Sequence, residues 1–221
     1  MGKKKKKRKL KKVFIVFFFI LIVSVIVFLL SLVKVKGYYV LDNNYLDEDT
    51  ILDTCGLDEN TSYFLTWSYF VNKKCDNNSM VKKVKVKHTK TLELRVHVEE
   101  YKVLFKYKDY AINELGKKID YPYEDAPILV NRISDKEVYD NFIRKMNKVD
   151  NEILTIVSEI KYDPNDVDKE RFLFYMNDGN MVYVTLSKIT KINSYPSITK
   201  TIENKKGVLY LDYGNYFVPI E

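Results

Sequence analysis

The sequence predicts an α+β protein in which a single N-terminal transmembrane helix precedes a β-α-α-β-β module and a second, mainly antiparallel β-domain with flanking helices. Three observations predict this fold: an unbroken apolar run near the N-terminus, an alternation of apolar and charged residues over 83–99, and short strand-like segments beyond residue 100. The 221 residues are 14% aromatic and include only 7 Gly and 5 Pro, which excludes low-complexity and wholly disordered chains.

The apolar run covers residues 13–33, and all but two of its residues are Val, Ile, Leu or Phe. As an α-helix it would be roughly 31 Å long, which matches the hydrocarbon core of a bilayer. A cleaved secretory signal is the alternative, but such signals have an apolar stretch of about 7–15 residues that ends at small residues. This run is longer and continues into Lys34 and Lys36 without such a site. We therefore expect a retained membrane anchor.

The formal net charge of +7 is concentrated at the N-terminus, because nine Lys and Arg residues lie within residues 1–12 and residues 13–221 carry −2. A nucleic-acid groove needs clustered positive charge on the folded part, so nucleic acid is not expected as a partner. The positive-inside rule predicts a cytoplasmic basic tail at 1–12, a transmembrane helix at 13–33 and an extracytoplasmic part beyond it. The tail either attracts anionic lipid or only sets this topology, and both roles stay open.

The only two cysteines, Cys55 and Cys75, fall in the extracytoplasmic part. A disulfide persists outside the cytoplasm, and closing this loop would contribute roughly 3 kcal/mol. Two unpaired, buried cysteines are an equally good interpretation. The spacing is not the C-x-x-C of a redox motif.

Residues 34–100 are expected to form the β-α-α-β-β module. Asp47 is a good N-cap and Gly56 a good C-terminal stop for its first helix. Alternation with period two predicts strands with one buried and one wet face. The strands are expected at 35–41, 83–87 and 92–99, and the helices over 47–56 and 66–75.

Residues 101–221 are expected to form the second domain, with a hairpin turn at Asn177-Asp178-Gly179-Asn180. Ser134 or Asp135 could cap a helix that carries apolar residues at helical spacing up to Val149. A second helical stretch is expected over 188–205, interrupted at Pro196. Strands are expected at 103–107, 110–113, 128–130, 153–162, 171–186, 208–213 and 216–218.

No catalytic or metal-binding constellation is recognisable. His88 and His97 are the only histidines, and the hairpin that contains them should keep their rings apart. Glu99 and Glu100 are neighbours on one strand, so their side chains should point to opposite faces. The nucleophile, zinc and phosphate-binding motifs of common enzyme families are missing. We therefore expect a binding protein with no catalytic residues, no cofactor, no metal and no small-molecule substrate.

The order of these parts resembles the FtsQ/DivIB family of bacterial cell-division proteins, over nearly the whole chain. The local matches are patterns of strand and turn: VKVKHTKTLELRVHVEEYKVLF at 84–105, NDGNMVYV at 177–184 and GVLYLDYGNYFV at 207–218. Two departures stand out. The turn Thr89-Lys90-Thr91 lacks the proline common in the family, and Tyr213 follows Asp212 where a Leu-Arg pair is usual.

The resemblance implies a POTRA domain at 34–100 and a partner-binding β-domain at 101–221. It also implies a non-catalytic scaffold of the septal division complex that contacts the small coiled-coil membrane proteins FtsB (DivIC) and FtsL. Its location would be the cell membrane, as a single-pass type II protein at the division septum. The alternatives are a membrane-anchored extracytoplasmic cell-wall enzyme and a membrane-anchored regulator.

Partner binding has a physical route that does not depend on the resemblance. A strand near the end of a chain can lie at a sheet edge, where an extended partner segment adds to its unpaired N–H and C=O groups. In the competing interpretation, the aromatic residues here only close the core. The candidate edge is Leu209, Tyr210, Leu211, Asp212 and Tyr213, and the aromatic platform beside it is Tyr216, Phe217 and Val218.

Overall fold

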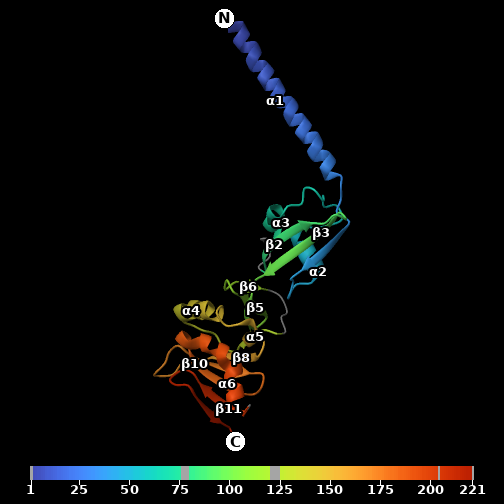
Figure 1. Cartoon of the computed structure of the whole chain (residues 1–221). Helices are drawn as coiled ribbons and strands as arrows, with labels where there is room; N and C mark the ends of the chain where they lie inside the picture. Colours follow the sequence, from blue (N-terminus) through green and yellow to red (C-terminus); the bar gives the residue numbers. More distant parts are fainter. Residues whose placement is uncertain (1, 76–79, 120–124, 204, 221) are drawn as a thin grey trace. The chain divides into compact units, whose positions relative to one another are not determined.

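The computed structural model describes residues 2–75, 80–119, 125–203 and 205–220, with side chains described from Lys12 onward (Figure 1). The chain divides into two compact units, Met1–Glu100 and Tyr101–Glu221. Parts of three expected segments lie outside the described residues: Met1 of the basic tail, Asn204 of the helical stretch 188–205, and residues 120–124 and Glu221 of the second domain.

The first unit begins with helix α1 (Gly2–Ser31), which contains the expected apolar segment. Residues Lys12–Ser31 are long and apolar enough to cross a membrane, and none of this stretch is buried against the protein. The helix ends two residues before the expected end at Val33. The reason is that Lys34 forms an isolated antiparallel bridge with Ser62, so the backbone is already extended there.

A three-stranded sheet and two short helices complete this unit. Strand β3 (Glu93–Glu100) lies in the centre, pairing in parallel with β1 (Gly37–Leu41) and antiparallel with β2 (Val81–His88). The helices α2 (Glu48–Cys55) and α3 (Ser68–Cys75) fall between β1 and β2 in sequence. The element order is therefore β-α-α-β-β, and the expected α2 caps form: Asp47 accepts a 2.8 Å hydrogen bond from the Thr50 N–H, and Gly56 has φ 60°.

Cys55 and Cys75, at the ends of α2 and α3, form a disulfide with an S–S distance of 2.06 Å. Both side chains are buried, so the bond lies inside the unit and ties its two helices together.

Helix α3 also covers the outer edge of β2. The Asn72 amide donates to the Val84 carbonyl at 2.5 Å and accepts from the Val84 N–H at 2.7 Å. The Ser68 hydroxyl accepts from the Val86 N–H at 2.8 Å. These side chains occupy backbone groups that an edge strand otherwise leaves unpaired.

The second unit is built on a nine-stranded sheet in the order β12-β11-β10-β9-β8-β7-β4-β5-β6. Five of its eight strand pairs are antiparallel, and the pairs β11–β10, β8–β7 and β7–β4 are parallel. The predicted α+β class is thus confirmed. The strands are β4 (Val103–Tyr107), β5 (Tyr110–Asn113), β6 (Lys118–Ile119), β7 (Ile128–Leu129), β8 (Val157–Tyr162), β9 (Arg171–Met176), β10 (Met181–Thr185), β11 (Gly207–Tyr210) and β12 (Tyr216–Pro219).

The helices of this unit are α4 (Lys136–Met146), α5 (Asn151–Leu154), the 3-10 helix η1 (Leu186–Ser194) and α6 (Tyr195–Thr201). Asp135 caps α4 by accepting from the N–H groups of Glu137 and Val138. Two expectations were wrong: the strand expected over 153–162 begins only at Val157, and the strand expected over 208–213 ends at Tyr210. The helical stretch expected to be interrupted at Pro196 forms two helices that meet beside this proline, since η1 ends at Ser194 and α6 begins at Tyr195. Proline fits the first turn of α6, where its missing N–H costs nothing.

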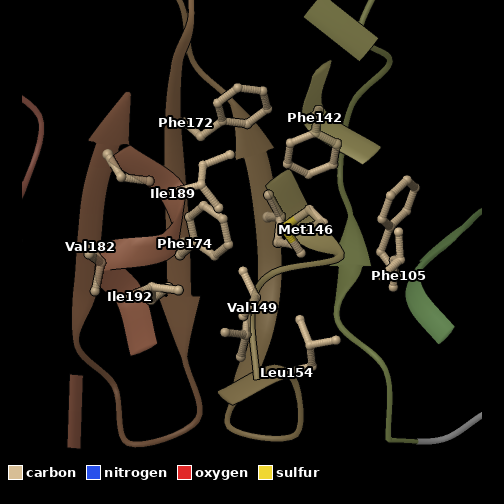
Figure 2. Close-up of a cluster of buried hydrophobic side chains, with 14 of the residues drawn as sticks. Phe105, Phe142, Met146, Val149, Leu154, Phe172, Phe174, Val182, Ile189 and Ile192 are labelled. Carbon is tan, nitrogen blue, oxygen red and sulfur yellow. The ribbon is translucent and has the colours of Figure 1, made fainter. Parts of the chain in front are cut away.

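The core of the second unit lies between the sheet and the helices that follow its strands (Figure 2). Phe142 of α4 stacks on Phe172 of β9, with ring centroids 4.7 Å apart and planes 7° apart. Ile189 and Ile192 of η1 and Val182 of β10 are fully buried in the same cluster. Because η1 is anchored in this core, the crossover from β10 through η1 and α6 returns the chain parallel to β10 as β11.

Candidate partner-binding edge of the C-terminal sheet

The free edge at the C-terminal end of the sheet is β12, not the segment that the sequence indicates. Strand β11 pairs with β10 on one side and β12 on the other, so the first residues of the expected edge, Leu209 and Tyr210, lie in an interior strand. The sequence indicates the wrong edge strand because the pairing that makes β11 an interior strand is long-range. Strands β10 and β11 pair in parallel, although η1 and α6 separate them in sequence.

The eight candidate residues therefore fall into two groups. Leu209, Leu211 and Asp212 are buried, with 2–4% of their surface exposed. Tyr213, Tyr216 and Val218 are 61%, 52% and 45% exposed, while Tyr210 and Phe217 are half-buried. The accessible apolar surface is thus concentrated at and beside β12.

The backbone of β12 alternates between pairing with β11 and facing outward. The Ile220 N–H donates to the Lys206 carbonyl at 2.9 Å, so Ile220 faces β11. Residues two apart on a strand face the same way, and the outward-facing residues of β12 are therefore Phe217 and Pro219. Phe217 offers an N–H and a C=O, whereas Pro219 offers only a C=O. Proline at this place is compatible with an edge strand because its missing N–H is not needed for the β11 pairing.

Gly207, the first residue of β11, allows β12 to approach closely. A Cβ at this position would lie 2.2 Å from the Val218 carbonyl oxygen and 2.8 Å from the Pro219 Cα. Both are backbone atoms that cannot rotate away. A side chain here would therefore push β12 off its neighbour.

The turn between β9 and β10 holds the start of β11 in place. Asn180 is 2% exposed; its side-chain oxygen accepts from the Gly207 N–H at 2.8 Å, and its amide donates to the Tyr195 hydroxyl, also at 2.8 Å. The Tyr195 hydroxyl in turn donates to the Asp178 carboxylate at 2.8–2.9 Å. Burial raises the pKa of the Tyr195 phenol far above its usual value, and Asp178 raises it further. The predicted turn at 177–180 is therefore part of a structural network.

Three tyrosines form a ladder across neighbouring strands on the face of the sheet opposite the core. Tyr183 of β10 stacks on Tyr210 of β11, with ring centroids 5.3 Å apart, and Tyr210 stacks on Tyr216 of β12 at 4.7 Å. Direct cross-strand pairing places these rings side by side. This tyrosine ladder ends at the free edge, where half of Tyr216 is exposed.

Arg171 of β9 supports the other end of the ladder. Its guanidinium carbon lies 3.6 Å from the centroid of the Tyr183 ring. The same guanidinium contacts Asp212 at 3.1 Å and Asp163 at 3.3 Å. Asp212, expected to contact a partner, is instead a buried carboxylate that fixes this arginine.

A groove of about 500 Å³ lies on the opposite, core-facing side of β12. Phe217 forms part of its wall and also packs against the core, as the competing interpretation of these aromatic residues expects. Helical residues of η1 and α6, including Lys191 and Ile198, form the other wall. The edge therefore has an exposed apolar row on one face and a hollow on the other.

The remaining candidates for chemistry have structural partners. His88 Nε2 lies 2.7 Å from the Tyr63 carbonyl, and His97 Nδ1 lies 2.8 Å from an Asp42 carboxylate oxygen. Glu100 accepts hydrogen bonds from three successive N–H groups, those of residues 44–46. Among the described residues, no group of three or more His, Cys, Asp or Glu side chains could hold a metal ion.

Sequence reasoning missed Arg171, Tyr183, Asn180 and Gly207 as parts of this site. Their strand positions are visible in the alternation of 171–186, but the cross-strand register is not, and the register alone aligns Tyr183 with Tyr210. Gly207 carries a weak signal, since an isolated glycine in a strand often marks close backbone approach.

A search of protein-family models finds none that matches the chain. Among curated proteins, the cell division protein DivIB of Bacillus subtilis (strain 168) is 29% identical over 206 residues, which cover 87% of this chain and 77% of that protein. The DivIB of Bacillus anthracis is also 29% identical, over 87% of this chain and 76% of the relative. The chain is a homologue of the DivIB cell division proteins.

The relation to DivIB extends beyond Bacillus, since the Listeria monocytogenes DivIB is 25% identical over 86% of this chain. A solved structure, the major extracytoplasmic domain of DivIB from Geobacillus stearothermophilus, covers 48% of the chain at 23% identity with a TM-score of 0.39. Homology to DivIB supports a role in cell division. The apolar helix α1 fits a single-pass membrane protein.

Proposed function

We propose that the protein is a non-catalytic, membrane-anchored scaffold of the bacterial division complex. Residues 1–12 stay in the cytoplasm, residues 13–33 anchor the chain, and the rest lies outside the cytoplasm at the division septum. Within it, 34–100 is the membrane-proximal POTRA-like domain and 101–221 the partner-binding domain. The charge difference across α1 supports this orientation.

The C-terminal unit binds small coiled-coil membrane proteins of the FtsB/DivIC and FtsL type by strand addition at β12. The observation that carries this proposal is the outward-facing backbone of Phe217 at the sheet edge. An extended partner segment donates to the Phe217 carbonyl and accepts from its N–H, and so becomes the next strand of the sheet.

Side chains beside β12 select the partner segment. Tyr216, Val218 and Ile220 alternate along the strand and are each about half exposed, so they form an apolar row on one face. A partner strand with apolar residues at alternate positions covers this row and extends the tyrosine ladder. Burying the row supplies affinity, while the backbone pairing sets the register.

The test uses the full chain in nanodiscs and purified partners of both types. Val218→Asp places a charge in the exposed row and should abolish binding without unfolding the protein, because Val218 is 45% exposed. Val167→Asp is the matched control, since Val167 is 80% exposed and lies in the loop between β8 and β9, not in β12. Normal binding by Val218→Asp would contradict the proposal.

Hydrogen exchange separates strand addition from binding by side chains alone. The Phe217 amide should exchange fast in the free protein and become protected in the complex, because the partner strand accepts its hydrogen bond. Fast exchange of this amide in a saturated complex would contradict strand addition even if Val218→Asp weakens binding.

A further inference from the structure

The first unit displays four large aromatic side chains within seven residues, and nothing in the division role uses them. Phe64, Trp67, Tyr69 and Phe70 are 43%, 62%, 74% and 59% exposed. Single exposed aromatic residues are ordinary on a soluble surface, but a cluster of this kind marks an interaction site. We call these four residues the aromatic patch.

The segment that leads into this patch is hydrogen-bonded to the end of helix α1. The Ser62 hydroxyl donates to the Leu30 carbonyl at 3.0 Å, within the last turn of the helix. The Tyr63 N–H donates to the Val33 carbonyl at 2.9 Å, and the Val35 N–H donates to the Thr61 carbonyl at 3.0 Å. Phe64 therefore follows directly after a residue held beside the end of the apolar span.

The rest of the patch is held close to the same place and turned away from the sheet. The Thr66 hydroxyl donates to the Ser62 carbonyl, which keeps Trp67 near this junction. On α3, Ser68 and Asn72 face β2, and Val71 and Cys75 are buried. Tyr69 and Phe70 consequently lie on the helix surface that the unit leaves uncovered.

We propose that the aromatic patch inserts into the outer headgroup region of the bilayer that α1 crosses. Trp and Tyr prefer this region because their rings are apolar and their N–H and O–H groups can still reach water. In sequence, the exposed cation Lys36 follows the junction and the exposed cation Lys73 follows the patch, and cations beside a membrane surface attract lipid phosphates. The hydrogen-bonded junction decides in favour of lipid over a soluble partner, since it fixes the patch at the level where the span leaves the hydrocarbon.

Trp67 is the only tryptophan of the chain, so its fluorescence reports on the patch directly. The full chain is reconstituted at a low protein-to-lipid ratio in phosphatidylglycerol–phosphatidylcholine vesicles, some with lipids brominated near the carbonyl end of the acyl chain. We expect a blue-shifted Trp67 emission, strong quenching by the brominated lipid and severalfold weaker quenching by aqueous acrylamide than for free tryptophan. Emission typical of water, with strong acrylamide quenching and no bromolipid quenching, would overturn the proposal.

A triple variant tests whether the patch as a whole is responsible. Phe64→Ser, Tyr69→Ser and Phe70→Ser together keep Trp67 as the reporter and should reduce its bromolipid quenching severalfold. The matched control is Leu115→Ser, Val130→Ser and Val167→Ser, three exposed apolar residues of the C-terminal unit, which should leave the quenching unchanged. Equal quenching in the wild type and in the patch variant would contradict a role of the patch.

Two further measurements keep the outcomes distinct. Resistance of each variant to alkaline extraction reports on insertion of α1, on which the inference depends, and an intact Cys55–Cys75 disulfide reports on the fold of the unit.

Adding a partner of the FtsL type tests whether the patch binds a protein instead of lipid. If Trp67 is quenched by acrylamide in vesicles alone and protected only when the partner is present, the patch binds protein and the lipid proposal is wrong.

Discussion

The side-chain oxygen of Asn180 accepts a 2.8 Å hydrogen bond from the backbone N–H of Gly207, 27 residues further along the chain. A single buried amide thus connects the β9–β10 turn to the first residue of β11. Because β12 pairs only with β11 in this sheet, the placement of the candidate binding edge depends on this contact.

Asn180→Ala should lower the free energy of unfolding by about 1–3 kcal/mol, because it leaves the buried Gly207 N–H and the Tyr195 hydroxyl with fewer partners. Urea denaturation measures the change. Asn177→Ala is the matched control in the same turn. Because Asn177 is exposed, this substitution should lower the free energy of unfolding by less. Equal effects of the two substitutions would argue against the network.

Gly207→Ala should displace β12, because the new Cβ would meet the Val218 carbonyl oxygen and the Pro219 Cα. We expect faster proteolysis after residue 213 and a loss of partner binding, while the near-ultraviolet circular dichroism of the core persists. Gly214→Ala is the control for proteolysis alone, which it should leave unchanged. Its Cβ would meet only the Tyr216 ring, at 2.9 Å, and that side chain can rotate away without moving the β12 backbone.

Arg171→Ala should destabilise the protein by about 3 kcal/mol, because it leaves the Asp212 carboxylate buried without its cation and removes the contact with Tyr183. The combination Arg171→Met with Asp212→Asn should recover part of this loss. Asp163→Ala should have a smaller effect, since Asp163 is more exposed and Arg171 keeps Asp212. Thermal unfolding measures all three. A double variant no more stable than Arg171→Ala would show that the ion pair is not the cause.

Cys55→Ser with Cys75→Ser should cost the first unit roughly 3 kcal/mol, the loop-closure value for cysteines 20 residues apart. Reductant should lower the melting temperature of the wild type towards that of the double variant. The double variant itself should not respond to reductant. If reductant lowers the melting temperature of the wild type and of the double variant equally, loss of the disulfide is not the cause of the change.

Tyr195 should make the C-terminal unit sensitive to high pH. Its pKa is raised in the folded state, mainly by burial, so the folded protein holds the phenol proton where the unfolded chain has lost it. The stabilisation is fully present below the unfolded pKa of about 10 and is lost as the pH rises above that value. Between about pH 10 and 12, stability should therefore fall more steeply in the wild type than in Tyr195→Phe. Parallel curves would contradict this assignment.

Local signals predicted the elements well. Asp47, Gly56 and Asp135 act as the caps that their residue types indicate, and residues 177–180 form the expected turn between two antiparallel strands. Alternation over 83–99 predicted β2 and β3 for the same reason: side-chain period and turn chemistry depend on near neighbours in sequence.

The sequence indicated which segment of the chain contains the candidate site, but not how its residues are arranged in space. Which strand lies at the edge depends on the β10–β11 pairing, a long-range contact that hydrophobic pattern does not encode. Asp212 looks like an exposed turn residue until Arg171, 41 residues earlier, is placed beside it. The tyrosine ladder likewise requires the register of three strands.

The side chains of Ser68 and Asn72 have a consequence for many copies of the chain confined to one membrane. Copies anchored in one membrane meet far more often than soluble copies. Unpaired strand edges at the same distance from the membrane would let neighbouring copies pair edge to edge and aggregate. Because side chains of α3 already bond backbone groups of Val84 and Val86, the β2 edge of the first unit is protected from such pairing. Contacts between crowded copies would then depend on other surfaces of the chain.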